Sequence, residues 1–133
     1  MIYLDTGAFL ARYLSRDQHH KKAVAAWVEI GRGGLRCFTS NFVLDETFTL
    51  LGRRAGYHFA AQRARLLYSS RVLTILRPGR EDELEAVEDF EKFADQKVSF
   101  TDCISWILMR RNKLRRAFSF DEHYRMAGFE LWP

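Results

Sequence analysis

The chain has 133 residues, of which 47% are apolar and 29% are charged, with eight glycines and two prolines. This length and composition fit one domain with a single core, and they exclude collagen-like, intrinsically disordered and disulfide-stapled mini-protein classes. Lysines and arginines number 21 against 17 aspartates and glutamates, which gives a net charge of +4. This excess permits an anionic partner without requiring one.

In the N-terminal half, short apolar strands alternate with amphipathic helices. Residues 2–4 predict a buried strand, and apolar side chains at helical spacing between residues 9 and 14 predict a helix. A second helix is predicted over residues 17–30, ended by glycines. A strand over 35–39 and a helix from about residue 41 to about residue 54 follow.

The second half continues this alternation. The predicted elements are helix 58–68, strand 72–76, helix 81–93, helix 101–109 and strand 117–120. In the helix over 81–93, Leu84, Val87 and Phe90 are expected to face the core. Strands and helices that alternate at this rhythm predict an α/β fold of three layers, α/β/α, with a mostly parallel central sheet.

The cysteines and the start of the chain bear on location. Cys37 and Cys103 lie far apart, and neither has a partner at zinc-ligand spacing, so neither a zinc site nor a disulfide framework is predicted. The sequence shows no basic leader and no apolar run of the ~18 residues that a membrane span needs. We therefore expect a cytoplasmic protein that makes no use of a membrane.

Two of the predicted strands end directly in an aspartate, Asp5 and Asp121. In open parallel sheets, ligands bind in the crevice beyond the carboxyl ends of the strands. Each aspartate alone could simply begin a turn or cap the next helix. Two such strand ends together favour a functional site.

Glu46 lies within or beside the apolar stripe of its predicted helix, where an unpaired glutamate is unusual. A buried arginine or a bound cation would each compensate its charge, and this residue alone does not decide between them. Its neighbour Asp45 is expected to face water.

Asp102 stands in the first turn of the most apolar predicted helix, three residues after Ser99. This spacing resembles a capping box, which is a purely structural explanation. The same helix start would also aim the carboxylate at the sheet edge, beside Asp5, Glu46 and Asp121. Four uncompensated carboxylates in one pocket repel one another, and a divalent cation is the simplest remedy. An all-oxygen ligand set favours Mg²⁺ or Mn²⁺.

Four short motifs, in this order and spacing, resemble the PIN domain family, in particular the short toxins of VapBC-type toxin–antitoxin pairs. They are Tyr3-Leu4-Asp5-Thr6, Leu44-Asp45-Glu46-Thr47, Ser99-Phe100-Thr101-Asp102-Cys103 and Phe118-Ser119-Phe120-Asp121. The resemblance covers nearly the whole chain and implies a single PIN domain over residues 1–133. It also implies an Mg²⁺- or Mn²⁺-dependent endoribonuclease that cuts RNA, forms a homodimer and is held inactive by a cognate antitoxin protein.

The resemblance further implies which residues do the work. The catalytic acids and metal ligands would be Asp5, Glu46, Asp102 and Asp121, and the supporting hydroxyl residues would be Thr6, Thr101 and Ser119. We expect Asp5 and Asp102 to be the principal ligands. Gly7 departs from the family, which often has Ser or Asn there, and Ser119 stands where Thr is commoner; neither change removes a proposed ligand.

A basic cluster follows the helix that begins with Asp102. It consists of Arg110, Arg111, Lys113, Arg115 and Arg116. These side chains could bind an RNA backbone, or they could face solvent because cations are favoured at helix C-termini. Arg53 and Arg54 allow the same two interpretations. His123, two residues after Asp121, could act as a general acid or base, or it could be a loop histidine near the rim of the pocket, and we expect the rim position.

Other classes with an acidic pocket fit less well. A phosphatase with an aspartate nucleophile needs a second acid two residues after Asp5, where Gly7 stands. A phospho-acceptor receiver domain needs an aspartate after a middle strand and a lysine at a later strand end, and this pair is missing. Two alternatives within the family stay open: a PIN nuclease of RNA processing, and a PIN module that binds RNA or a partner without cutting.

Overall fold

The computed structural model describes all 133 residues, and its five strands form one sheet in the order β3-β2-β1-β4-β5. The strands are β1 (Ile2–Leu4), β2 (Cys37–Ser40), β3 (Leu73–Leu76), β4 (Arg116–Phe118) and β5 (Glu130–Trp132). Every pairing is parallel. All three residues of the central strand β1 are buried, as expected where helices cover both faces of a parallel sheet.

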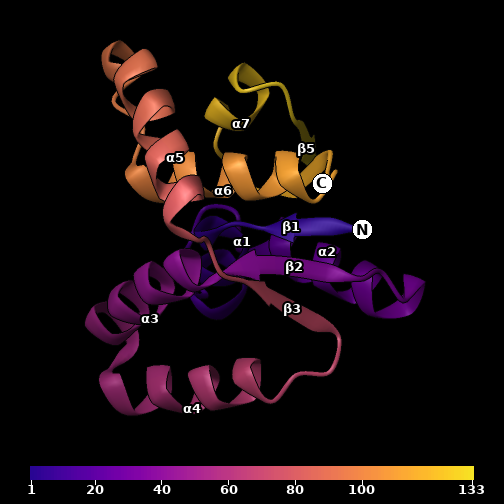
Figure 1. Cartoon of the computed structure of the whole chain (residues 1–133). Coiled ribbons are helices and arrows are strands. Elements are labelled where there is room, and N and C mark those ends of the chain that lie inside the picture. Colours follow the sequence, from indigo (N-terminus) through magenta and orange to yellow (C-terminus); the bar gives the residue numbers. More distant parts are fainter.

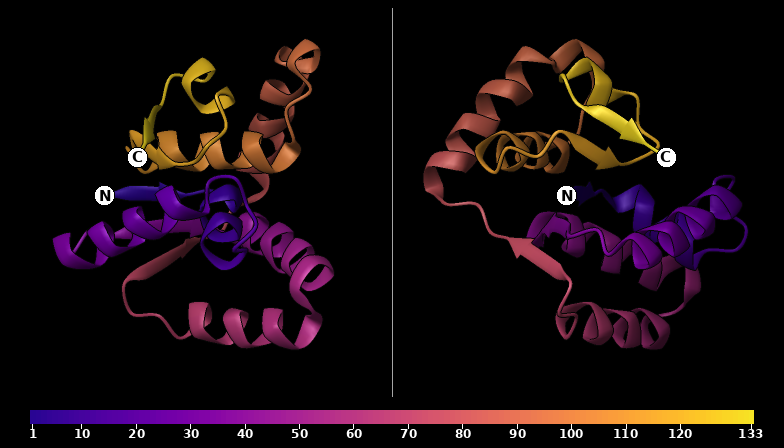
Figure 2. Two further views of the ribbon diagram at one scale, coloured as in Figure 1. Left: turned by 180° about the vertical axis from the view of Figure 1, so that it is seen from behind. Right: turned by 90° about the vertical axis from the view of Figure 1, so that its right-hand side faces the viewer.

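Helices form a layer on each side of this sheet (Figure 1). One layer holds α1 (Thr6–Tyr13), α2 (His20–Gly33), α3 (Asn41–Ala55) and α4 (Tyr57–Tyr68), and the other holds α5 (Arg80–Lys92), α6 (Phe100–Arg111) and α7 (His123–Met126). The 3₁₀ helix η1 (Ala94–Gln96) joins α5 to α6. Figure 2 shows the same two layers from behind and from the side. The predicted three-layer α/β/α fold is confirmed, and none of its helices combines the length and the apolar character that crossing a membrane requires.

The order of the strands fixes where a ligand can bind. The chain moves outward from β1 through β2 to β3, and then returns through α5 and α6 to β4 on the other side of β1. The segments after β1 and β4 therefore leave towards opposite layers, which makes the carboxyl ends of these two neighbours a topological switch point. Asp5 follows β1 directly, and Asp121 lies three residues beyond the end of β4.

The helix α6 is the most deeply buried helix of its layer. Eight of its twelve residues are buried, from Asp102 to Met109. The indole ring of Trp106 meets the rings of Phe93 and Tyr124 edge to face, with centroids 5.5 and 6.1 Å away. This packing fixes the helix on the sheet, and with it the position of Asp102 in its first turn.

The predicted inward face of α5 is wrong. Leu84, Val87 and Phe90 are 53%, 49% and 46% exposed, whereas Ala86 is buried. Two aspartates of α5 face α6 instead, where they pair with arginines. Ion pairs thus form part of the contact with α6, and the apolar stripe of α5 lies mostly towards solvent, with the Phe90 ring meeting that of Phe100 edge to face at 5.7 Å.

Several boundaries also differ from those expected. The helix α2 continues through Gly31 to Gly33 and ends at Gly34, whose φ of 61° is in the left-handed region that glycine tolerates. The strand β4 ends at Phe118 instead of residue 120, which releases Ser119 into the loop that leads to the site. The short elements α7 and β5, of four and three residues, were not predicted.

Candidate active site

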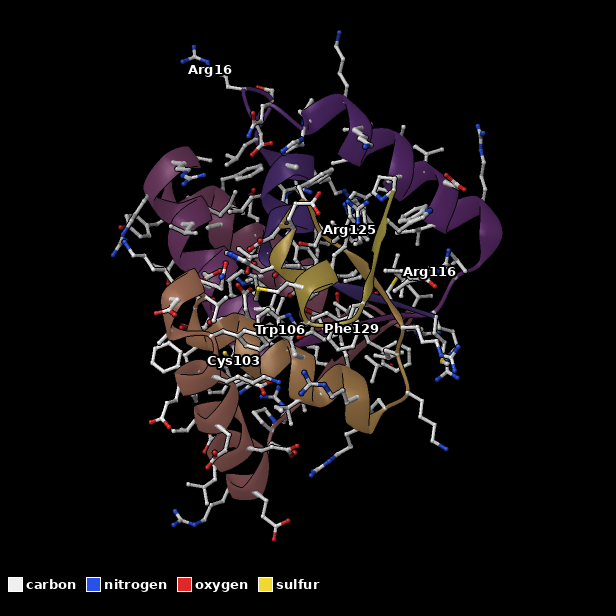
Figure 3. The ribbon with its side chains drawn as sticks, turned by 90° about the horizontal axis from the view of Figure 1, so that it is seen from above. Arg16, Cys103, Trp106, Arg116, Arg125 and Phe129 are labelled. Carbon is white, nitrogen blue, oxygen red and sulfur yellow. The ribbon has the colours of Figure 1, made fainter.

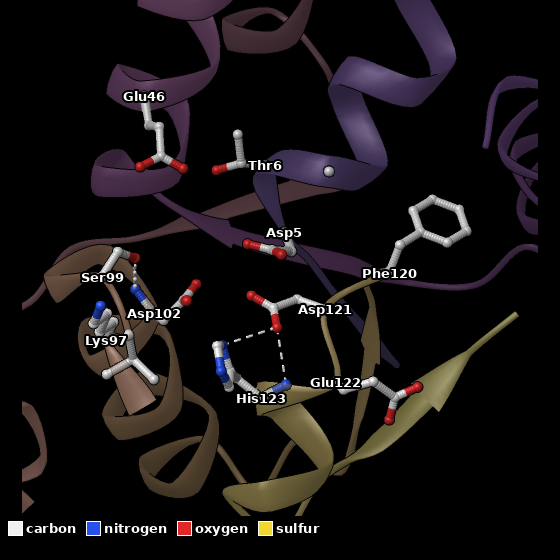
Figure 4. A pocket seen from close by; sticks show the side chains of 12 residues that line it. Asp5, Thr6, Glu46, Lys97, Ser99, Asp102, Phe120, Asp121, Glu122 and His123 are labelled. Atoms are coloured by element: carbon white, nitrogen blue, oxygen red, sulfur yellow. Dashed lines mark hydrogen bonds and ion pairs between the residues drawn. The ribbon is translucent and has the colours of Figure 1, made fainter. Parts of the chain in front are cut away.

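A cavity of about 580 Å³ opens at the carboxyl ends of β1 and β4. All four predicted acids line it, and the structure brings them there from four different segments of the chain (Figure 4). The other lining residues are Thr6, Gly7, Lys97, Val98, Ser99, Phe120, Glu122 and His123. Thr101 and Ser119, predicted to support the site, are not among the residues that line the cavity.

Asp5 is held by the loop that follows the neighbouring strand β4. It occupies the N-cap position of α1, but its side chain makes no capping hydrogen bond, so the capping explanation does not apply. Its Oδ2 atom accepts a hydrogen bond of 2.8 Å from Ser119 Oγ, which in turn accepts one of 3.1 Å from the backbone N–H of Asp121. Ser119 thus lies behind the cavity and links two of the acids.

Burial governs the protonation of Asp5. Removal from water raises the pKa of this carboxyl to about 6, and the hydrogen bond from Ser119 acts in the opposite direction. The charge of Asp121 also favours the protonated form.

Asp102 lies in the first turn of α6. The Ser99 hydroxyl caps this helix and accepts a hydrogen bond of 3.0 Å from the Asp102 backbone N–H. The capping prediction is therefore confirmed for Ser99, whereas the Asp102 carboxylate does not return a bond to the Ser99 backbone. Its side chain stays available to the cavity.

The pKa of Asp102 is raised to about 8, first by burial and then by the charges of Asp5, Asp121 and Glu46. A carboxyl group that holds its proton near neutral pH, through burial and then through three neighbouring carboxylates, indicates that no ion pair compensates the negative charge of this site. The repulsion expected from the sequence is thus present in the structure.

Glu46 reaches the cavity from α3, where it is half-buried. None of the ion pairs in the structure involves it, so the buried arginine that would have explained its position is absent. Its neighbour Asp45 is exposed, as expected, and does not line the cavity. Of these two adjacent acids, only Glu46 faces the cavity, whereas Asp45 faces solvent.

Asp121 and His123 form a local pair at the lower edge of the cavity in Figure 4. Asp121 Oδ1 accepts a hydrogen bond of 2.9 Å from the His123 backbone N–H and lies 3.0 Å from its Nδ1 atom. Ligand atoms of Asp102, Asp121 and His123 all lie within 4.8 Å of one another, a separation at which one cation can contact three groups. His123 therefore lies at the edge of the cavity and contacts one of the four acids directly.

Thr6 contributes a hydroxyl group without a partner. Its side chain is 6% exposed, and its Oγ1 atom is buried with no hydrogen bond. A buried polar atom left unpaired at a cavity is unusual in a protein that has no ligand there. This hydroxyl group has no partner within the protein, although the oxygen atom itself is shielded from solvent.

The basic cluster lies away from the acids. Arg111 is nine residues beyond Asp102 on α6, a rise of ~13 Å along a helix. Arg110 precedes Arg111 on the helix, and the remaining three members lie in the turn after α6 and at the start of β4. The cluster is therefore at the amino edge of the sheet, whereas the cavity is at the carboxyl edge. Figure 3 shows Arg116 at the right of the molecule, well separated from Arg16 in the loop after α1 at the upper left.

Two members of this cluster already have partners. Arg110 pairs with Asp89 at 3.0 Å and Arg111 pairs with Asp82 at 2.7 Å, both on α5. These contacts hold α5 against α6. RNA binding by the basic cluster stays a prediction, and its contacts would lie far from the carboxylates.

Sequence reasoning missed Lys97 altogether. It lies at the end of η1 and lines the cavity, but a single lysine in a loop carries no periodicity or motif that would have marked it. Phe120 and Glu122, which flank Asp121, also line the cavity. Asp95, two residues before Lys97, is exposed and does not line the cavity.

Comparison with known proteins places this geometry in a family. The PIN domain profile matches residues 2–130. The 23S rRNA-specific endonuclease VapC20 of Mycobacterium tuberculosis is 33% identical over 129 residues, which cover 97% of this chain and 95% of that protein. A VapC ribonuclease of Archaeoglobus fulgidus is 34% identical over 134 residues and is covered to 83%.

Solved structures agree with these sequence matches. The crystal structure of M. tuberculosis VapC20, described as a sarcin–ricin loop cleaving toxin, has a TM-score of 0.88 and 30% identity, with 97% of this chain and 96% of that chain covered. VapBC2 of Rickettsia felis, bound to a DNA fragment from its promoter, shares the fold with a TM-score of 0.72 at 11% identity, with 99% and 98% of the chains covered. The chain belongs to the PIN domain family.

Proposed function

We propose that this protein is a divalent-metal-dependent endoribonuclease and the toxin of a VapBC-type toxin–antitoxin pair. The observation that carries the proposal is the convergence of four carboxylates, from four segments of the chain, on a cavity in which no lysine or arginine pairs with them. The full-length similarity to two VapC ribonucleases supports the same activity. The presence of all four acids argues against a module that binds RNA without cutting it.

The residues present fit a Mg²⁺ or Mn²⁺ ion. The donor set is dominated by carboxylate oxygens, and a divalent charge would relieve the repulsion that raises the pKa of Asp102. Asp5 and Asp102 would be the principal ligands, and Asp121 and Glu46 would complete the cage or orient a water molecule. A bound divalent cation lowers the pKa of a coordinated water and offsets negative charge on phosphoryl oxygens.

The chain's own residues keep the acids in place and position the reactants. Ser119 holds the carboxylate of Asp5, and His123 holds that of Asp121. The free hydroxyl group of Thr6 would contact the attacking water or a phosphate oxygen. In the hydrolysis, the oxygen of water bonds to phosphorus, the bond from phosphorus to one ribose oxygen breaks, and that oxygen takes up a proton. No covalent bond to the protein forms.

Substrate and partner follow from the relatives. VapC20 is described as specific for 23S rRNA, and we propose the sarcin–ricin region of that RNA as the first substrate to test. A small antitoxin protein is the proposed partner, since structural neighbours include toxin–antitoxin complexes. We further propose that residues 1–133 act as a single PIN domain, that the protein is a homodimer, and that it acts in the cytoplasm, where ribosomal RNA is found.

The test is RNA cleavage by matched variants. Purified protein is incubated with an end-labelled sarcin–ricin stem-loop and with single-stranded RNA, in Mg²⁺ or Mn²⁺ and in EDTA. Wild type and Asp45→Asn are expected to cleave, whereas Glu46→Gln, which changes the adjacent residue inside the cavity, is expected to lose at least 100-fold. Equal cleavage by Glu46→Gln and wild type, or cleavage that persists in EDTA, would contradict the proposal.

A further inference from the structure

Lys97 is the only lysine or arginine among the twelve residues that line the carboxylate cavity. It lies between η1 and the Ser99 cap of α6, and Figure 4 shows its side chain at the rim beside Ser99 and Asp102. Although five carboxylates line the same cavity, the ammonium group forms an ion pair with none of them. The charge is therefore available to a ligand.

An RNA substrate that enters this cavity needs a positive charge beside the carboxylates. A phosphodiester is an anion, and it must approach five carboxylates whose combined charge exceeds that of one divalent ion. Cations placed where charge develops on phosphoryl oxygens are a general way to stabilise phosphoryl transfer. The nearest members of the basic cluster are held by α5 at the other edge of the sheet and cannot serve this purpose.

We propose that the ammonium group of Lys97 binds a non-bridging oxygen of the scissile phosphate and holds it against the carboxylates. The proposal rests on the ribonuclease function proposed above. As water adds to phosphorus and the bond to the leaving oxygen breaks, negative charge builds on the non-bridging oxygens, and Lys97 offsets it. Lys97 keeps its proton throughout and exchanges no atom with the substrate.

The backbone conformation of Lys97 allows a substitution that removes its charge without disturbing the fold. Lys97 has a φ of 53°, and the only other residue besides glycine with a positive φ is Lys113, at 56°. Lys113 lies in the exposed turn after α6, at the opposite edge of the sheet. Glycine adopts this conformation without strain, so Lys97→Gly and Lys113→Gly each remove one charge without a cost in stability.

The experiment compares Lys97→Gly, Lys97→Arg and Arg32→Gln with wild type, and Lys113→Gly, which changes a member of the basic cluster, serves as a control for folding and metal binding only. Lys97→Gly is expected to lower kcat/KM for RNA cleavage 10- to 100-fold and Lys97→Arg is expected to restore part of it. Arg32→Gln, which removes one exposed charge at the end of α2 outside the basic cluster, is expected to stay within twofold of wild type. Calorimetric titration of Mn²⁺ without RNA is expected to give the same affinity for both glycine variants. Cleavage by Lys97→Gly at the wild-type rate, or a loss fully explained by weaker Mn²⁺ binding, would overturn the proposal.

A second readout does not depend on cleavage. In an Asp5→Asn background, Lys97→Gly is expected to flatten the slope of log affinity for single-stranded RNA against log salt by ~0.7, the value for one lost phosphate contact. Arg32→Gln is expected to leave the slope unchanged. Equal slopes for all three proteins, or an equal change in both variants, would refute a specific contact. Failure of wild type to cleave any RNA would instead count against the proposed function.

Discussion

Replacement of Asp102 by asparagine should make the metal-free protein more stable at pH 8. Burial and the neighbouring carboxylates raise the pKa of this side chain to about 8 in the folded state, whereas in the unfolded chain it titrates near 4. A raised pKa means that the stabilising form is the protonated one. Its contribution is complete below pH 4, and it is lost progressively as the pH rises from 4 to 8.

The magnitude follows from the same values. Each tenfold change in proton affinity corresponds to ~1.4 kcal/mol. Ionisation of Asp102 lowers the free energy of unfolding. Because water enters at the mouth of the cavity and the ionised groups can move apart, we expect this loss to be only ~2 kcal/mol at pH 8. The neutral amide introduced by Asp102→Asn would remove that cost, and ~2 kcal/mol corresponds to a rise in Tm of roughly 6–8 °C for a chain of this size.

The assay is thermal unfolding in EDTA at pH 4 and at pH 8. Wild type and Asp102→Asn are expected to melt at similar temperatures at pH 4, with the variant melting higher at pH 8. Addition of Mg²⁺ at 100 times the Kd of wild type should stabilise wild type by ~2.7 kcal/mol and the variant by no more than ~1.4 kcal/mol, since the variant is expected to bind the ion at least tenfold more weakly. A variant that is less stable than wild type at pH 8 in EDTA would refute the reasoning.

Three further outcomes are expected. Ser119→Ala removes the hydrogen bond to the Asp5 carboxylate and should weaken Mn²⁺ binding about tenfold, as measured by calorimetry, without loss of the fold; unchanged affinity would contradict this. Leu84→Gln on the exposed face of α5 should change the free energy of unfolding by less than ~0.5 kcal/mol, whereas Leu44→Ala in the core should cost ~2–5 kcal/mol in urea unfolding, and similar costs would show that α5 is packed differently. The affinity for Mg²⁺ should rise steeply between pH 6 and pH 8, because Asp102 must lose its proton to bind the ion, and a flat pH profile would count against its role as a ligand.

The fold and the acids of the site could be predicted because each depends on a regular pattern. Alternating strands and helices define the layers, and the parallel sheet brings its carboxyl ends to one edge. Asp5 and Asp121 follow strands, so their meeting was foreseeable. Glu46 could be identified by its place beside an apolar stripe. No ion pair in the structure involves it, which favours a bound cation over a buried arginine.

What could not be predicted depends on contacts between distant segments. The inward face of α5 is partly polar because Asp82 and Asp89 meet arginines of α6, and the helical pattern of α5 alone cannot show this. Neighbouring cations at 110–116 look like one binding surface in the sequence, but only the topology shows at which edge of the sheet they lie. Lys97 reaches the cavity from the segment between η1 and α6, where no periodicity applies.

The central claim is that the four carboxylates hold a divalent cation, and calorimetric titration of Mn²⁺ into the metal-free protein at pH 7.5 tests it without any substrate. Wild type and Asp45→Asn are expected to bind with equal affinity, whereas Asp5→Asn and Asp102→Asn are expected to bind at least tenfold more weakly. Equal affinity of wild type and both cavity variants would show that the ion, if it binds, is held elsewhere.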